Sequence, residues 1–154
     1  MSTVKVDTIQ TTGGVSEIAI DKLKGVSAAS SISVVAEGGT TTTNLQQGRA
    51  KMWVNYTGIS TTASRDSFNV STLTDVDTGK TTININNDMG NANYSGYYYT
   101  NAATGTAYGN FDNTYTGGFG SFAAGACSNN AHGTSSGANV DSYQNLCGIF
   151  GDLA

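Results

Sequence analysis

The 154-residue sequence contains no proline and few charged residues, and both absences bear on its structure. Proline is one of the residues that protect the exposed edges of β-sheets, so we expect neighbouring subunits to cover the edges of any sheet in this protein. Charged residues make up 12% of the chain, about half the share of roughly 25% in typical soluble domains. Thr, Ser, Asn and Gly supply the polar character instead, and these residues suit turns and pleated surfaces.

Basic residues are also scarce, with 7 Lys and Arg against 11 Asp and Glu, which gives a net charge of -4. Because a nucleic-acid-binding surface needs basic side chains that neutralise phosphates, we expect no nucleic-acid partner. No apolar run approaches the roughly 20 residues of a membrane-spanning helix, and residues 1–10 contain no apolar signal-peptide core. The sequence therefore predicts a soluble chain that does not insert into a membrane and stays where it is made, unless a larger particle carries it out of the cell.

The sequence offers little catalytic chemistry, because it has only 2 cysteines and 1 histidine. Cys127 and Cys147 do not form a CxxC pair, so a zinc site is not expected. We expect two reduced thiols, and a disulfide between them is the alternative. His132 lies in a Gly- and Ser-rich stretch without stiff flanking elements, so a Cys127–His132 nucleophilic pair is not expected either.

The acidic residues form neither a catalytic nor a calcium-binding pattern. Each Asp that could join a glycosidase pair lies near a turn, where Asp is common for backbone reasons. Residues 75–79 begin like a calcium loop, but Asn86 stands at the twelfth position, where an EF-hand needs an acidic ligand. We therefore predict a protein that is not an enzyme and that uses no metal or cofactor.

Residues 1–30 differ in composition from the rest of the chain and predict an N-terminal attachment arm. Apolar and polar residues alternate over residues 2–12, which indicates a short strand. Residues 16–25 have an N-cap serine, early acidic residues, late lysines and a closing glycine, which favours a helix of about two turns, although part of the segment also alternates like a strand. A helix this short needs a partner surface. The candidate attachment residues are Val4, Val6, Ile9, Ile18, Ile20 and Leu23.

Residues 31–48 predict a connector between the arm and the main domain. Residues 32–35 indicate a strand, and the glycines that follow indicate a turn. Thr43 or Asn44 is placed to cap a short helical turn at residues 45–47.

Residues 49–154 predict an all-β domain. Strand-like segments, separated by turn residues such as the Asp-Thr-Gly at 77–79, recur at 50–56, 65–73, 80–87 and 92–100. Short strands with a turn every ten or so residues predict an antiparallel β-sandwich or a jelly-roll-like domain. The closing segment, 143–151, has apolar residues on both faces, which predicts a strand that is covered on both sides.

Trp53 and a run of tyrosines are expected to reach the outside of this domain. Because side chains alternate along a strand, Trp53 lies on the opposite face from Met52 and Val54. A large exposed indole would be a liability, so Trp53 is a candidate interface residue, buried at a contact between subunits or layers. The consecutive residues Tyr97–Tyr99 must likewise point to both faces, which places part of the run in the core and part at the surface.

Residues 101–141 combine Gly-rich loops with spaced aromatic residues, an arrangement in which a rigid scaffold presents contact side chains on adaptable loops. Together with the strand at 94–99, this region is expected to form the surface farthest from the arm. Phe119 and Phe122 are expected to fill a core under the loops. The candidate contacts with a host or partner are Tyr97, Tyr99, Tyr108, Phe111 and Tyr115.

Several long stretches of the chain resemble one family. They are MSTVKVDTIQTTGG at 1–14, SISVVAEGGTTTTNLQQGRAKMWVNY at 31–56, RDSFNVSTLTDVDTGKTTININNDMGNANY at 65–94 and the closing GIFGD at 148–152. These stretches resemble virion structural proteins of marine tailed phages, including tail-fibre-like proteins of cyanophages. The likeness covers residues 1–94 and about 143–152, and leaves 95–142 as a variable loop region.

The resemblance implies a non-catalytic particle component, made in the host cytoplasm and located in the virion, that is a homotrimer and contacts other phage proteins of the tail or capsid. The first hypothesis is a tail-fibre or adhesin-type subunit, attached through its arm, whose C-terminal loops contact host surface polysaccharide or protein. The chain is short for a fibre with a long shaft, so a capsid decoration or cement protein is the alternative. An enzyme that degrades polysaccharide is the third hypothesis.

Overall fold

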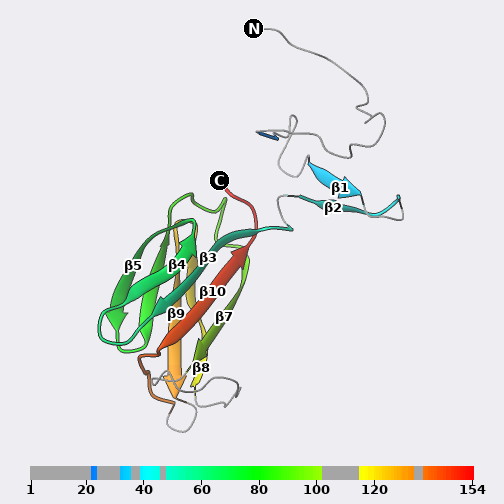
Figure 1. The fold of residues 1–154 in the computed structure, drawn as a ribbon. Coiled ribbons are helices and arrows are strands. Elements are labelled where there is room, and N and C mark those ends of the chain that lie inside the picture. Colours follow the sequence, from blue (N-terminus) through cyan, green and yellow to red (C-terminus); the bar gives the residue numbers. More distant parts are fainter. Residues whose placement is uncertain (1–21, 24–31, 36–38, 46–47, 102–114, 134–136) are drawn as a thin grey trace, which may run out of the picture.

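The chain folds into antiparallel β-sheets (Figure 1). The structure is a computed structural model, and it describes residues 22–23, 32–35, 39–45, 48–101, 115–133 and 137–154. The strands are β1 (Ser33–Val35), β2 (Thr42–Asn44), β3 (Ala50–Thr57), β4 (Ala63–Phe68), β5 (Val70–Asp77), β6 (Lys80–Ile85), β7 (Ser95–Asn101), β8 (Tyr115–Ala123), β9 (Ala126–Gly133) and β10 (Gln144–Phe150). No helix occurs among the described residues, and the predicted all-β antiparallel class is confirmed.

The main domain consists of two four-stranded sheets. One has the strand order β4-β3-β10-β7 and is called sheet 1 here, and the other has the order β5-β6-β9-β8 and is called sheet 2. Both contribute to a single buried core, so the arrangement is sandwich-like. Three pairs of consecutive strands, β3–β4, β5–β6 and β8–β9, form hairpins within a sheet, which favours the sandwich alternative over the jelly roll.

The core follows from the alternation of side chains along the central strands. In β3, Met52, Val54 and Tyr56 are buried, while the residues between Met52 and Tyr56 that alternate with them are only half-buried. The strands β6, β9 and β10 show the same alternation. The buried apolar residues that pack together are Met52, Val54, Tyr56, Ile83, Ile85, Met89, Cys127, Cys147 and Ile149.

One end of the core is polar and is held together by side-chain hydrogen bonds. The hydroxyl groups of Tyr98 and Ser142 both donate to Asn145 Oδ1, at 2.6 and 2.5 Å. Asn129 Nδ2 donates to the hydroxyl oxygen of Tyr56 at 3.3 Å. Burial raises the pKa of both tyrosine hydroxyls, so they stay neutral and act as hydrogen-bonding groups inside the domain.

Asn69 joins the two sheets at a corner. The segment predicted as one strand at 65–73 is divided here, because Asn69 has a φ of 59° and turns the chain from β4 in sheet 1 to β5 in sheet 2. Asn tolerates this left-handed conformation better than most residues. Its side chain also holds the corner, since Nδ2 donates to the Lys51 carbonyl at 2.8 Å and Oδ1 accepts from the Asn87 N–H at 2.8 Å.

The predicted Asp-Thr-Gly turn joins β5 to β6. Gly79 has a φ of 67°, and a Cβ at this position would lie 2.6 Å from the Ala131 carbonyl oxygen and 2.7 Å from the backbone of Val140. Its N–H donates to Asp141 Oδ1 at 2.8 Å. Only glycine meets both the conformational and the steric requirement at this turn.

The connector differs from the prediction in one respect. The strand expected at 32–35 is present as β1, but Thr43 and Asn44 lie in β2, where they were expected to cap a helical turn. Thr and Val favour strands, and the β2 residues pair with Ser33–Val35 to form a two-stranded ribbon. In the helix expected at 16–25, Lys22 and Leu23 have no regular structure, and its other residues lie outside the described ones.

Candidate functional site: an aromatic face on sheet 1

The outer face of sheet 1 carries large aromatic side chains. In β3 the inward positions of Met52 and Val54 direct Trp53 to the outer face, as the alternation predicts. In β7, Tyr98 packs against the core, so Tyr97 and Tyr99 point outward. We call this surface the aromatic face, and it consists of Trp53, Phe68, Tyr97, Tyr99 and Phe150 with the half-buried Leu146.

The register of the strands aligns three of these residues with Gly148 in one row. Trp53 is paired with Phe68 of β4 on one side and with Gly148 of β10 on the other. Gly148 is paired in turn with Tyr97 of β7. Residues that pair directly lie on the same face of a sheet. One row therefore crosses sheet 1, and its members in order are Phe68, Trp53, Gly148 and Tyr97. The row spans three strand spacings of about 4.8 Å, or roughly 14 Å.

Gly148 allows Tyr97 to lie along the sheet. A Cβ at Gly148 would be 2.5, 2.6 and 2.7 Å from Cε1, Cζ and the hydroxyl oxygen of Tyr97, so the phenol end of this side chain crosses the glycine. The ring therefore points across β10 toward the strand that carries Trp53, and it covers backbone that would otherwise face solvent. One side of the ring stays open, since Tyr97 is 51% exposed.

Polar side chains border the aromatic row. The next row across the sheet contains Asp66, Asn55, Leu146 and Tyr99. Arg65 donates from Nη1 to Asn55 Oδ1 at 3.4 Å and from Nη2 to the carbonyl oxygen of Tyr143 at 2.6 Å. Its guanidinium also lies 4.5 Å from the centre of the Tyr143 ring, a cation–π distance. The face therefore combines open aromatic rings with amide, carboxylate and guanidinium groups.

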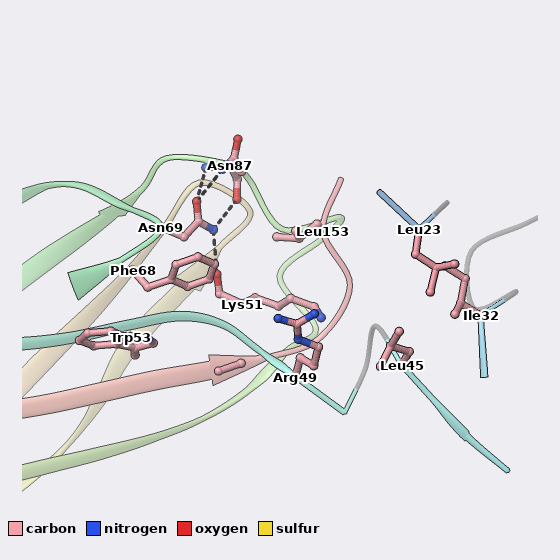
Figure 2. A pocket seen from close by; sticks show the side chains of 11 residues that line it. Leu23, Ile32, Leu45, Arg49, Lys51, Trp53, Phe68, Asn69, Asn87 and Leu153 are labelled. Atoms are coloured by element: carbon pink, nitrogen blue, oxygen red, sulfur yellow. Dashed lines mark hydrogen bonds between the residues drawn. The ribbon is translucent and has the colours of Figure 1, made fainter. Parts of the chain in front are cut away.

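The aromatic row continues into a hollow at the end of sheet 1 where β3 begins (Figure 2). This hollow has a volume of about 830 Å³, and Trp53 and Phe68 are among its lining residues. Arg49 and Lys51 also line it, and burial is the main reason that the pKa of Lys51 is lowered. The other apolar residues that line the hollow are Leu23, Ile32, Leu45, Ala50 and Leu153.

The outer face of sheet 2 is different, because short polar side chains cover its central strands. Asn84 Nδ2 donates to Thr72 Oγ1 at 2.9 Å and to Thr74 Oγ1 at 3.1 Å, and so links β6 to β5. The hydroxyls of Ser121 and Ser128 lie 2.9 Å apart and link β8 to β9. These side chains satisfy one another, and they leave a surface that interacts well with water.

The described part of the chain places some of the predicted site residues together. Tyr97 and Tyr99 are exposed on the aromatic face, and Trp53 is half-buried on the same face. Leu23 lines the hollow beside them. Tyr108, Phe111 and the arm residues Val4, Val6, Ile9, Ile18 and Ile20 lie outside the described residues, as does the side chain of Tyr115.

Three residues on the outer side of sheet 1, Phe68, Gly148 and Phe150, were not predicted as part of a contact surface. Phe68 is 53% exposed at the end of β4, and Phe150 is 37% exposed in β10, with its ring centre 6.3 Å from that of Tyr97. The closing strand was predicted to be covered on both sides. Its inner face is buried, whereas Phe150 on its outer face is exposed. Alternation alone indicates that Phe150 and Gly148 share a face, but only the register shows that Tyr97 lies over Gly148.

The groups considered for catalysis are not brought together. Cys127 and Cys147 are free, buried and located in different sheets, and the contact between the two thiols together with burial raises the pKa of Cys147. His132 lies five positions after Cys127 in the same strand, which puts the two side chains on opposite faces of β9. Phe119 packs against the core as expected, whereas Phe122 is 39% exposed.

Comparison with known proteins identifies no relative: no protein-family model, curated protein or solved structure matches this chain. Among the described residues, no group of three or more His, Cys, Asp or Glu side chains is arranged to hold a metal ion. The same residues contain no helix of the length and apolarity needed to cross a membrane.

Proposed function

We propose that this chain is a non-catalytic virion structural protein of a tailed phage, a tail-fibre or adhesin-type subunit. It attaches to the particle through its N-terminal arm and presents its β domain to a host surface. The resemblance of residues 1–94 and 143–152 to marine phage proteins supports this proposal. The observation that carries it is the aromatic face, where Phe68, Trp53 and Tyr97 form one row across a rigid sheet.

The chemistry of this row fits a contact surface better than a catalytic site. Trp and Tyr are enriched at binding surfaces, because they bury a large apolar area and lose few rotatable bonds on binding. Single exposed apolar residues are common, but a row that crosses a whole sheet is a feature of interaction surfaces. Tyr97 and Phe68 are each about half exposed on the outer face of sheet 1, so the row offers open contact area to a large partner.

The subunit is further proposed to work as a homotrimer. The edge strands of both sheets, β4, β5, β7 and β8, expose backbone groups, and every residue of β4 is exposed. The sequence contains no proline to protect these edges. Association with two other copies would cover them. Light scattering of the purified chain should therefore give the mass of a trimer at micromolar concentration, and a stable monomer would contradict this part of the proposal.

The location on the particle tests the function. We propose labelling purified phage particles with antibody against the recombinant chain and viewing them by negative-stain electron microscopy, with an antibody against a non-virion phage protein as the control. A tail-fibre or adhesin subunit places the label at the tail. Label spread over the head would support the alternative, a capsid decoration protein, and particles without label would contradict both. Release of reducing ends from host polysaccharide by the pure protein would contradict the non-catalytic role.

A further inference from the structure

The aromatic face has the shape and chemistry of a platform for an extended ligand. Its row runs in a straight line over four strands, and the Tyr97 ring lies along the sheet over Gly148 with one side open. An extended ligand that lies over Tyr97 and reaches Trp53 spans two strand spacings, or roughly 10 Å. This length suits a polymer with a short repeating unit better than a compact small molecule.

The groups beside the row favour a ligand that is rich in hydroxyl groups. Pyranose rings whose hydroxyls are equatorial have two apolar faces of C–H groups, which stack on aromatic rings, and hydroxyls around the edge. The hydroxyl group of Tyr97 and the side chains of Asn55 and Asp66 lie in or next to the row and can donate or accept hydrogen bonds. Aromatic rings with adjacent amide and carboxylate groups thus match both parts of such a sugar.

The charge of the face disfavours an acidic glycan. Arg65 and Asp66 contribute one charge of each sign at the border of the row, and Arg65 already donates to Asn55 and to the Tyr143 carbonyl. The cations Arg49 and Lys51 lie in the hollow beyond Trp53 and Phe68, where burial lowers the pKa of Lys51. The whole chain carries a net charge of -4, which repels a polyanion. A neutral polysaccharide meets no such repulsion.

A second copy of the chain is a weaker candidate for the occupant. The five aromatic residues of the face are at most 53% exposed, and they are Trp53, Phe68, Tyr97, Tyr99 and Phe150. At 150–250 Å² for a whole aromatic side chain, they offer roughly 400 Å², about half of the roughly 800 Å² per partner in a stable protein interface. In the row that follows, Asp66 and Asn55 stand beside Leu146 and Tyr99, so the apolar area continues over only half of that row.

We propose that the aromatic face binds neutral polysaccharide chains of pyranose units with equatorial hydroxyls, which stack on Tyr97 and Trp53. This inference relies on the proposed function only for its biological setting. Glycan binding by the purified protein needs no phage particle, and labelling of particles needs no glycan, so the two proposals can fail independently.

Trp53 reports on this binding directly, because it is the sole tryptophan of the chain. The experiment titrates the full-length protein with cellohexaose and chitohexaose, whose ring substituents are equatorial, as the neutral probes. Mannohexaose, whose 2-hydroxyl is axial, serves as a comparison, and an alginate hexasaccharide is the acidic probe. Calorimetry measures affinity, and iodide quenching measures the accessibility of the indole. We expect at least one neutral probe to bind and to reduce quenching of Trp53, and we expect the alginate probe to bind at least tenfold more weakly.

Substitutions separate stacking from other causes. Trp53→Ala and Tyr97→Ala should each weaken binding of the neutral probe about tenfold, whereas Tyr97→Phe, which keeps the ring, should retain most of it. Phe122→Leu is the matched control, because it removes an exposed aromatic ring of sheet 2 and should leave affinity unchanged. Thermal unfolding shows whether each variant is folded.

Three outcomes would overturn the inference. The first is no binding of any neutral probe by the folded protein at millimolar concentration. The second is equal binding of the alginate probe, or affinity that Tyr97→Ala and Trp53→Ala leave unchanged. The third is dissociation of an oligomer by the same two substitutions without any glycan binding, which would assign the face to contact between copies of the chain.

Discussion

The outer faces of the two sheets differ although their inner faces are built alike. On the inside, Ile149 of sheet 1 and Ile83 of sheet 2 are both fully buried and contribute to the same core. On the outside, sheet 1 presents the aromatic face, whereas sheet 2 presents Thr, Asn and Ser side chains that bond to one another. Folding requires only the inner faces to be apolar, so the aromatic residues on the outside of sheet 1 have a different reason, which we assign to contact.

The largest expected effect tests the equivalence of the inner faces. Ile83→Ala in sheet 2 and Ile149→Ala in sheet 1 each leave a cavity in the common core, and each should lower the free energy of unfolding by about 2–5 kcal/mol. Urea unfolding followed by circular dichroism measures both. If one substitution cost less than about 1 kcal/mol, that sheet would not contribute to the core as described.

A matched pair of glycine substitutions tests the difference between the outer faces. In Gly148→Ala the new methyl group meets the Tyr97 ring, and in Gly120→Ala it meets the side chains of Ser128 and Asn130. Each neighbour can move aside, so both variants should lose only about 1 kcal/mol of stability. Gly148→Ala should also lift Tyr97 from the sheet and increase iodide quenching of Trp53, whereas Gly120→Ala should not. Equal quenching in the two variants would contradict the arrangement of Tyr97.

A titration tests the burial of Tyr94 at the edge of the core. Burial raises the pKa of Tyr94 from 10.0 to about 12, and its hydroxyl lies 3.0 Å from the carbonyl oxygens of Ala123 and Ala126. The raised pKa means that the neutral phenol stabilises the fold fully below pH 10 and that this stabilisation is lost as the pH rises toward 12. Urea unfolding from pH 9 to 12 should show this decline, and Tyr94→Phe should reduce it. An unchanged pH profile in the variant would contradict the assignment.

The smallest expected effect concerns the polar face of sheet 2. Asn84→Ala removes the three hydrogen bonds that Nδ2 donates to Thr72 and Thr74, at a site where water can replace them. The free energy of unfolding should fall by about 0.5–1 kcal/mol. Calorimetric titration with the neutral hexasaccharides should give the same affinity as the unsubstituted protein. Weaker glycan binding in this variant would show that the two outer faces are not functionally distinct.

Much of the fold could be predicted from local patterns. Alternation identified the strands around Val54, Ile83 and Cys147, and the Asp-Thr-Gly sequence identified the β5–β6 turn. The corner at Asn69 was missed because a left-handed asparagine leaves no clear sign in a strand-like segment. The strand position of Thr43 was missed because short Thr-rich segments satisfy both cap and strand preferences, and only pairing with β1 decides between them.

The sequence by itself determined which side chains face inward and which face outward, because this depends only on the alternation along each strand. It thereby determined that Trp53, Tyr97 and Tyr99 lie on the side away from the core of their own strands. The tertiary structure alone decided that Trp53 and Tyr97 belong to one surface. That outcome depends on the placement of β10 between β3 and β7 and on the register that sets Gly148 between the two rings. Pairing between segments distant in the chain is set by the packing of the whole core, since a slip of one residue would turn every inward side chain outward.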